Sequence, residues 1–111
     1  MTEIRLITSN LIDEIKDLTQ KADNLYWIVA FAMESGVRLV LPHLKEAAAN
    51  GAEIKILIGD YLHITQPDAL ELLFLELPEA EIRLFESRGT SFHPKAYLFR
   101  TSNNAHIIVG S

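Results

Sequence analysis

The stretch Leu25-Tyr-Trp-Ile-Val-Ala-Phe-Ala-Met33 is almost continuously apolar and is rich in aromatic and β-branched side chains. It follows the turn-forming pair Asp23-Asn24 and ends before Glu34-Ser35-Gly36. A short apolar run between turn signals is typical of a strand that is buried on both faces. The sequence therefore predicts a central strand whose rings, Tyr26 and Trp27, pack in the core, with a base-stacking platform as the alternative role for the two rings.

Helices and strands alternate on both sides of this stretch. Period-two alternation predicts strands over residues 3–8, 52–58 and 80–85, and helical spacing predicts a helix after an N-cap at Asn10 and another over residues 37–50 that contains Pro42. A third helix is expected to begin at Thr65-Gln66-Pro67-Asp68, which has the form of a capping box, and to end before Pro78. Its predicted buried stripe consists of Leu70, Leu73, Phe74 and Leu77.

The last part of the chain reads as two further strands, one that begins near His93 and ends at Phe99 and one over residues 105–111 that ends in Gly-Ser, joined by a polar turn at residues 100–104. The whole pattern is βαβαβα followed by βββ. Alternating strands and helices indicate parallel strands, and the terminal hairpin adds antiparallel ones. We therefore predict one α/β domain over residues 1–111, with a mixed β-sheet and helices on both of its faces.

Composition narrows the class of protein further. The chain has 111 residues, no cysteine and a net charge of −5, which argues against a domain that holds nucleic acid by long-range attraction alone. The first residues do not have the form of a secretory signal, and no apolar run approaches 18 residues. These features predict a cytoplasmic protein that does not interact with a membrane.

The strongest candidate site lies in the run Gly89-Thr-Ser-Phe-His-Pro-Lys-Ala-Tyr-Leu-Phe99. His93 and Lys95 are two residues apart, so on a strand they share a face at about 6 to 7 Å, a spacing that suits one phosphate. A neutral imidazole can attack phosphorus, and an ammonium group can hold the phosphate oxygens. The next strand ends in Gly110-Ser111, where small residues let a ligand approach the backbone.

This arrangement resembles the phospholipase D superfamily, whose signature is His-x-Lys, then Asp after four more residues, and Gly-Ser-x-Asn at the end of the following strand. The matching residues are His93, Lys95, Gly110 and Ser111. Within the superfamily the chain is most similar to the PLD-like domains of metal-independent restriction endonucleases and of DEAD/DEAH-type helicase proteins. That likeness extends to Phe92–Phe99, to Thr90-Ser91, to Gly59-Asp60-Tyr61-Leu62, and to Thr65-x-Pro67-x-Ala69-Leu70.

Two positions depart from the signature. Arg100 stands where the superfamily has Asp, and the sequence ends at Ser111, two residues before the place of the signature Asn. The resemblance therefore leads us to expect a fragment of a longer protein, cut after the Gly-Ser of the motif.

The resemblance implies a nuclease that uses neither metal nor cofactor. In this reading His93 is the nucleophile or general acid, Lys95 and Ser111 stabilise the phosphate, and a phosphohistidine intermediate forms. One histidine cannot both attack the phosphorus and protonate the leaving group on the opposite side, so two copies of the motif are required. They would come from a homodimer or from a second PLD-like half in the parent protein. The expected partner is nucleic acid, with DNA favoured.

Further residues are expected around the phosphate. Thr90, Ser91, Arg88 and Gly110 are candidate substrate contacts, and Glu34, just past the apolar strand, is a candidate for orienting the histidine. Asp60 and His63 are second-rank candidates in a loop. Two alternatives remain open: a catalytically incomplete PLD-like module for dimerisation or DNA positioning, and a phosphate-binding regulatory domain.

Overall fold

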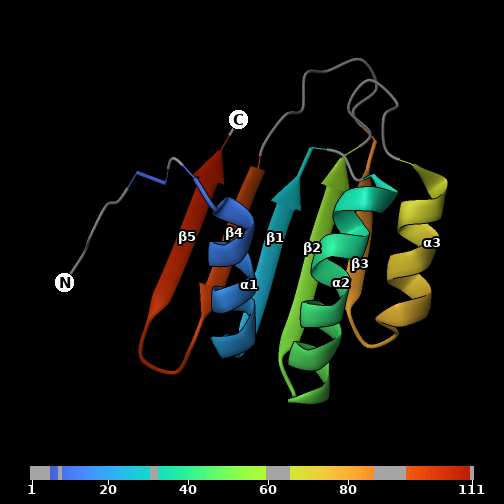
Figure 1. The fold of residues 1–111 in the computed structure, drawn as a ribbon. Coiled ribbons are helices and arrows are strands. Elements are labelled where there is room, and N and C mark those ends of the chain that lie inside the picture. Colours follow the sequence, from blue (N-terminus) through green and yellow to red (C-terminus); the bar gives the residue numbers. More distant parts are fainter. Residues whose placement is uncertain (1–5, 8, 31–32, 60–65, 87–94, 111) are drawn as a thin grey trace.

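The computed structural model describes residues 6–7, 9–30, 33–59, 66–86 and 95–110. In these residues three helices and five strands follow one another along the chain (Figure 1). The elements are α1 (Leu11–Lys21), β1 (Asn24–Val29), α2 (Glu34–Ala49), β2 (Glu53–Gly59), α3 (Pro67–Glu76), β3 (Glu81–Phe85), β4 (Lys95–Arg100) and β5 (Ala105–Gly110). The strand predicted over residues 3–8 falls mostly outside the described residues, and Leu6 and Ile7 belong to no strand.

The strands form one mixed sheet in the order β3-β2-β1-β4-β5. β1 runs parallel to β2, and β2 runs parallel to β3. β4 pairs antiparallel with β1 on one side and with β5 on the other. The predicted mixed sheet, with its terminal hairpin and with β1 at its centre, is confirmed.

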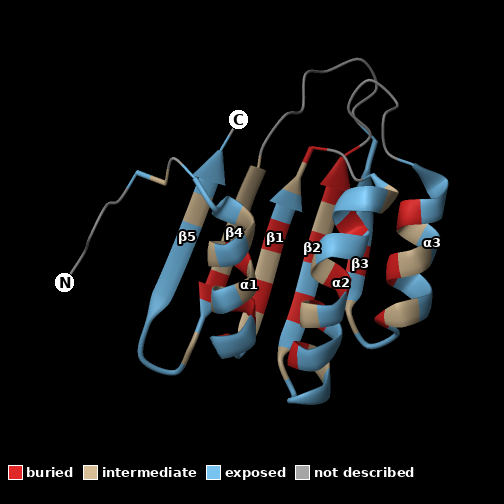
Figure 2. Cartoon of the chain, viewed as in Figure 1, coloured by how far each residue is buried: buried red, intermediate tan, exposed pale blue. Residues whose placement is uncertain are grey.

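The helices of the described structure all lie on one face of the sheet (Figure 1). Buried and more exposed residues alternate along β1 (Figure 2). Leu25 and Trp27 are buried against the helices, whereas on the other face Tyr26 is partly exposed and Ile28 is 39% exposed. The prediction of helices on both faces is therefore not met in the described part of the chain. The physical reason is that an apolar run shows that a strand can be buried on both sides but does not supply the second layer.

The core lies between the three helices and the sheet. Its largest fully buried side chains include Phe99 of β4, Leu25 of β1, Leu44 of α2 and Ile58 of β2. Trp27 packs edge-on against Phe99, with ring centroids 5.8 Å apart. Trp27 is thus a core residue, as the buried-strand interpretation predicted, and it is not displayed for base stacking.

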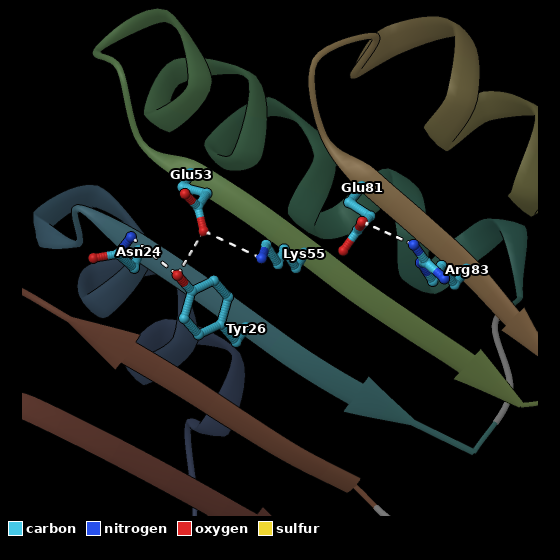
Figure 3. Close-up of polar contacts among 6 residues, drawn as sticks. All are labelled: Asn24, Tyr26, Glu53, Lys55, Glu81 and Arg83. Carbon is cyan, nitrogen blue, oxygen red and sulfur yellow. Dashed lines mark hydrogen bonds and ion pairs between the residues drawn. The ribbon is translucent and has the colours of Figure 1, made fainter.

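We call the uncovered side of the sheet the open face. The part of the open face that extends from β1 to β5 is apolar. On β5 the side chains of Ile107 and Val109 are 67% and 73% exposed. The apolar residues of this face are Ile28, Leu57, Phe85, Ala96, Leu98, Ile107 and Val109. Charged side chains stand at the opposite corner, on β2 and β3 (Figure 3). Parallel strands are usually covered on both faces, so the open face is an uncommon feature of this sheet.

The ends of the helices correct several expectations about local sequence. Asn10 does precede α1, but its backbone is left-handed (φ 58°) and its side chain makes no capping hydrogen bond. The N-cap position of α3 is held by Gln66, not by Thr65, which lies outside the described residues. Gln66 serves another helix: its Oε1 accepts a 2.7 Å hydrogen bond from the backbone N–H of Glu34, the first residue of α2.

Two further features of the helices differ from the sequence pattern or complete it. Pro42 lies inside α2, which continues through the proline as one helix and is not divided into two segments. Phe74 of α3 was expected in the buried stripe, yet it is 56% exposed, because Ala69, Leu73 and Leu77 form the buried side of that helix. Gly51 follows α2 with φ 90°, a conformation that glycine adopts without steric cost.

Among the described helices, none combines the length and the apolar character needed to span a lipid bilayer.

Candidate functional site

The register of the sheet brings three residues into one row at the carboxyl end of β1. Lys95 of β4 is the partner of Val29 in β1, and it is also the partner of Gly110 in β5. Directly opposed Cα atoms in antiparallel strands are about 5 Å apart. Lys95 and Gly110 therefore lie side by side, and their sharing of one anion stays a prediction.

Lys95 begins β4 and is half-buried. It belongs to the same alternating set as Tyr97 and Phe99, whose rings pack against Trp27, so it lies on the helix-covered side of the sheet. Further along β4, the rings of Tyr97 and Phe99 hold the backbone of the strand in place, since Phe99 is fully buried. The first residue of this interior strand, Lys95, therefore has a rigidly held backbone next to the carboxyl end of β1, which suits a side chain that must hold a charge in place.

Gly110 is exposed at the end of β5, and a Cβ built on it would meet no atom of the described residues within 4 Å. The described neighbours therefore do not require a glycine here. The other residues of the motif and its surroundings, His93, Ser111, Arg88, Thr90 and Ser91, lie outside the described residues, as do Asp60 and His63. Their roles stay predictions.

Glu34 is the first residue of α2 and follows the carboxyl end of β1, as expected. Its carboxylate accepts two hydrogen bonds from the guanidinium of Arg38, at 2.7 and 2.9 Å. In the described structure the carboxylate of Glu34 is stabilised by this ion pair and by the N-terminal end of α2, which favours negative charge. Its proposed task of orienting His93 stays a prediction.

Two of the arginines near His93 in the sequence, Arg83 and Arg100, do not lie beside Lys95 in the described structure. Arg100 ends β4 opposite Asn24, five residues from Lys95 and so about 16 Å away along the strand. Arg83 lies on β3, near the far edge of the sheet, and pairs with Glu81 at 3.2 Å. The position where the superfamily signature has Asp is therefore at the opposite end of β4 from Lys95.

A second group of polar side chains occupies the amino end of the parallel strands on the open face (Figure 3). The Tyr26 hydroxyl donates a 2.6 Å hydrogen bond to Oε1 of Glu53 and accepts one from Asn24 Nδ2 at 3.2 Å. Lys55 stands 3.7 Å from the same carboxylate and 5.6 Å from the centroid of the Tyr26 ring. The hydrogen bond from Tyr26 lowers the pKa of Glu53, and in return it raises the pKa of Tyr26.

We expect Tyr26→Phe to return the pKa of Glu53 toward its ordinary range, because the phenol donates the hydrogen bond that favours the carboxylate. Since folding lowers the Glu53 pKa, its stabilising contribution is present above the unfolded pKa and is lost as pH falls through the folded value. Side-chain carboxyl NMR titration measures the shift. Tyr97→Phe is the control, because Tyr97 lies on the covered face; an unchanged Glu53 pKa in Tyr26→Phe would contradict the assignment.

Neither the contact of Tyr26 with Glu53 nor that of Gln66 with Glu34 could be predicted from the sequence pattern. Tyr26 and Glu53 are 27 positions apart, and Glu34 and Gln66 are 32 apart. Each pair meets only through the parallel register of β1 with β2 or the packing of α3 beside α2. The sequence placed the Tyr26 ring in the core together with Trp27, and for Tyr26 that prediction is wrong, because its face of β1 is not covered in the described structure.

Comparisons with known proteins relate the chain to others by fold alone. No family model matches the sequence, and no curated protein matches it either. Among solved structures, TrmBL2, an archaeal chromatin protein, superimposes with a TM-score of 0.53 at 14% identity over 78% of this chain and 31% of its own. A polyphosphate kinase from Porphyromonas gingivalis gives 0.54 at 15% identity over 83% of this chain and 16% of its own. The chain thus spans less than a third of either protein.

Proposed function

We propose that the chain is a PLD-like domain of a metal-independent phosphodiesterase that cleaves nucleic acid, attached in its parent protein to a helicase or restriction enzyme. The observation that carries the proposal is the row of Val29, Lys95 and Gly110 at the carboxyl end of β1. His93 precedes Lys95 by two residues and Ser111 follows Gly110 directly, so the proposal assigns both halves of the motif to this one end of the sheet.

The reaction needs two proton-transfer roles as well as a nucleophile. An imidazole nitrogen of His93 forms a bond to phosphorus, and the bond from phosphorus to the leaving oxygen breaks. A second histidine on the other side gives its proton to that oxygen. Water then attacks the phosphohistidine, the second histidine takes a proton from the water, and the P–N bond breaks. Lys95 and the Ser111 hydroxyl stabilise the charge that develops on the phosphoryl oxygens in both steps.

The second histidine comes from a second copy of the motif, in a twofold homodimer or in another part of the parent protein. Nucleic acid as the substrate is supported by the resemblance of the motif and by the fold shared with a chromatin protein whose structure shows DNA binding. The polyphosphate kinase among the similar structures adds a phosphate-handling protein of related fold. Because Thr90, Ser91 and Arg88 would contact phosphate, they would add affinity without sequence preference.

The test is hydrolysis of bis(p-nitrophenyl) phosphate in excess EDTA by the full natural protein that carries this chain. We expect His93→Ala to lower kcat/KM by at least about 10³-fold, since it removes the nucleophile. Activity that survives in His93→Ala, or that EDTA abolishes in the unaltered protein, would contradict the mechanism. Light scattering on the active sample checks the second copy, because a strict monomer with one motif and full activity has no second histidine.

The competing function is a non-catalytic module for dimerisation or DNA positioning, which the Arg100 departure favours. It predicts DNA binding with no turnover in the same assay. The position of Arg100 at the far end of β4 weakens this alternative, because a change there leaves the Lys95 end of the strand untouched.

A further inference from the structure

The two motifs of the proposed mechanism must meet at one phosphate. A near-attack distance of about 3 Å on one side of the phosphorus and a hydrogen bond of about 3 Å on the other leave the two imidazoles within about 8 Å of each other. His93 is two residues from Lys95, so the rows of Val29, Lys95 and Gly110 in the two copies must also be close. This requirement decides which surface of the domain can carry the twofold interface.

The edges and the open face of the described sheet do not meet this requirement. If two β5 edges paired antiparallel, the two β4 strands would be about 14 Å apart and their Lys95 ends would point in opposite directions. The β3 edge is farther from β4 than the β5 edge. If two open faces stacked, the sheets would be about 10 Å apart, with both Lys95 side chains on the outer, helix-covered sides. The interface that unites the motifs therefore lies at the carboxyl end of β1, on the side of the helices.

An apolar groove is present at this end of the described structure. It lies between α1 and α2, both of which begin at the carboxyl end of β1 (Figure 1). Its volume is about 260 Å³. Its lining includes Val29, the direct partner of Lys95 in the sheet, and Tyr97, two residues further along β4. The groove therefore reaches the row that is proposed to hold the phosphate.

Exposed apolar side chains lie at the rim of the groove. Met33, directly before α2, is 42% exposed, and Leu39, in the second turn of α2, is 56% exposed. Among the described residues no charged side chain lines the groove. We call this groove with its two rim residues the end groove. In a twofold interface the same patch serves both copies, so an exposed leucine beside an apolar groove is a self-complementary surface.

We propose that the end groove is the twofold interface between two copies of this chain, with Leu39 of each copy seated in the groove of its partner. This inference rests on the proposed function, because the need for a second motif places the interface at this end of the sheet. The second copy contributes the histidine that protonates the leaving oxygen. The apolar contact beside the Lys95 row holds the two motifs on opposite sides of one phosphorus.

Leu39→Asp in the full natural protein tests this interface, because it places a carboxylate in the apolar contact. The side chain is exposed in the single chain, so the variant should fold, which circular dichroism verifies. We expect light scattering over a dilution series to show the Kd of the dimer raised at least about 100-fold, since the change occurs twice across the axis. Met33→Asp serves where Leu39→Asp does not fold, because residue 33 is the N-cap of α2 and aspartate is favoured there.

The activity of the variant should depend on protein concentration. Below the raised Kd, the rate of bis(p-nitrophenyl) phosphate hydrolysis in EDTA should increase with the square of the protein concentration, and above it kcat should match that of the unaltered protein. Loss of a catalytic group would instead lower kcat at every concentration. Leu75→Asp is the matched control, because Leu75 is 70% exposed in the last turn of α3, which lies at the amino end of the strands (Figure 1). It should change neither the Kd nor the rate.

The outcomes separate this interface from the proposed function. A dimer that the folded variant leaves intact, whether active or not, overturns the end groove as the interface, and so does an unaltered protein that is a monomer at every concentration. A dimer that the variant dissociates, while Leu75→Asp does not, supports the interface. If that dimer hydrolyses no phosphodiester, only the proposed function fails.

Discussion

Replacing Lys95 with alanine is expected to lower kcat/KM for phosphodiester hydrolysis by about 10² to 10³-fold in the full natural protein, with the fold unchanged. The size follows from removing one charged donor aimed at the oxygens where negative charge develops. The lysine sits at the end of β4 in register with Val29 and Gly110, so its backbone is held by strands on both sides. Loss of the side chain therefore removes a charge while both neighbouring strands still hold the backbone.

Two variants sharpen this prediction. Lys95→Arg keeps the charge and should recover only part of the rate, because a planar guanidinium cannot take the position of an ammonium group. Lys45→Ala is the matched control, since Lys45 lies on α2, exposed, in a 2.8 Å ion pair with Glu76. It should leave the rate unchanged. Circular dichroism verifies that each variant is folded, and a folded Lys95→Ala protein with full activity would remove Lys95 from the mechanism.

Replacing Phe99 with alanine is expected to lower the free energy of unfolding by about 3 to 5 kcal/mol. Phe99 is 1% exposed and packs edge-on against Trp27, so its loss leaves a cavity at the centre of the sheet. A domain of this size is stable by about 5 to 15 kcal/mol in total, so the loss is a large share of the whole stability. Urea denaturation followed by far-ultraviolet circular dichroism gives the value.

Phe74→Ala is the matched control for this change. The side chain removed is the same, but Phe74 is largely exposed on α3, and surface substitutions alter stability by about 0.5 kcal/mol or less. Equal losses for the two variants would mean that the core is not where the structure places it. A small loss for Phe99 alone would mean that the covered face repacks around the missing ring.

The order of elements was predictable because it depends on local signals. Alternation in Ile54, Ile56 and Ile58 marks β2, and Asn50-Gly51 marks the end of α2. The pairing of Lys95 with Gly110 followed from the short turn that joins β4 and β5, since a hairpin loop fixes register.

The remaining features depend on contacts between distant parts of the chain. That Phe74 faces solvent while Ala69 is buried depends on how α3 is rotated against α2, which the apolar pattern of PDALELLFLE leaves open. Ile28 is exposed because no second layer covers its face of the described sheet, and the sequence of β1 does not show whether such a layer is present. The pairing of Glu34 with Arg38 spans four residues of α2, but the helix predicted over residues 37–50 began after Glu34 and so did not contain this contact.

The antiparallel junction between β1 and β4 has a consequence for the order of folding. Val29 and Lys95 are 66 positions apart in the chain, whereas Lys95 and Gly110 are joined within a single hairpin. A hairpin forms in about 1 to 10 μs, while closing a long loop costs more chain entropy and takes longer. We expect the β4–β5 hairpin to form early and to pair with β1 last. Lys95 would then reach the carboxyl end of β1 only in the final step of folding.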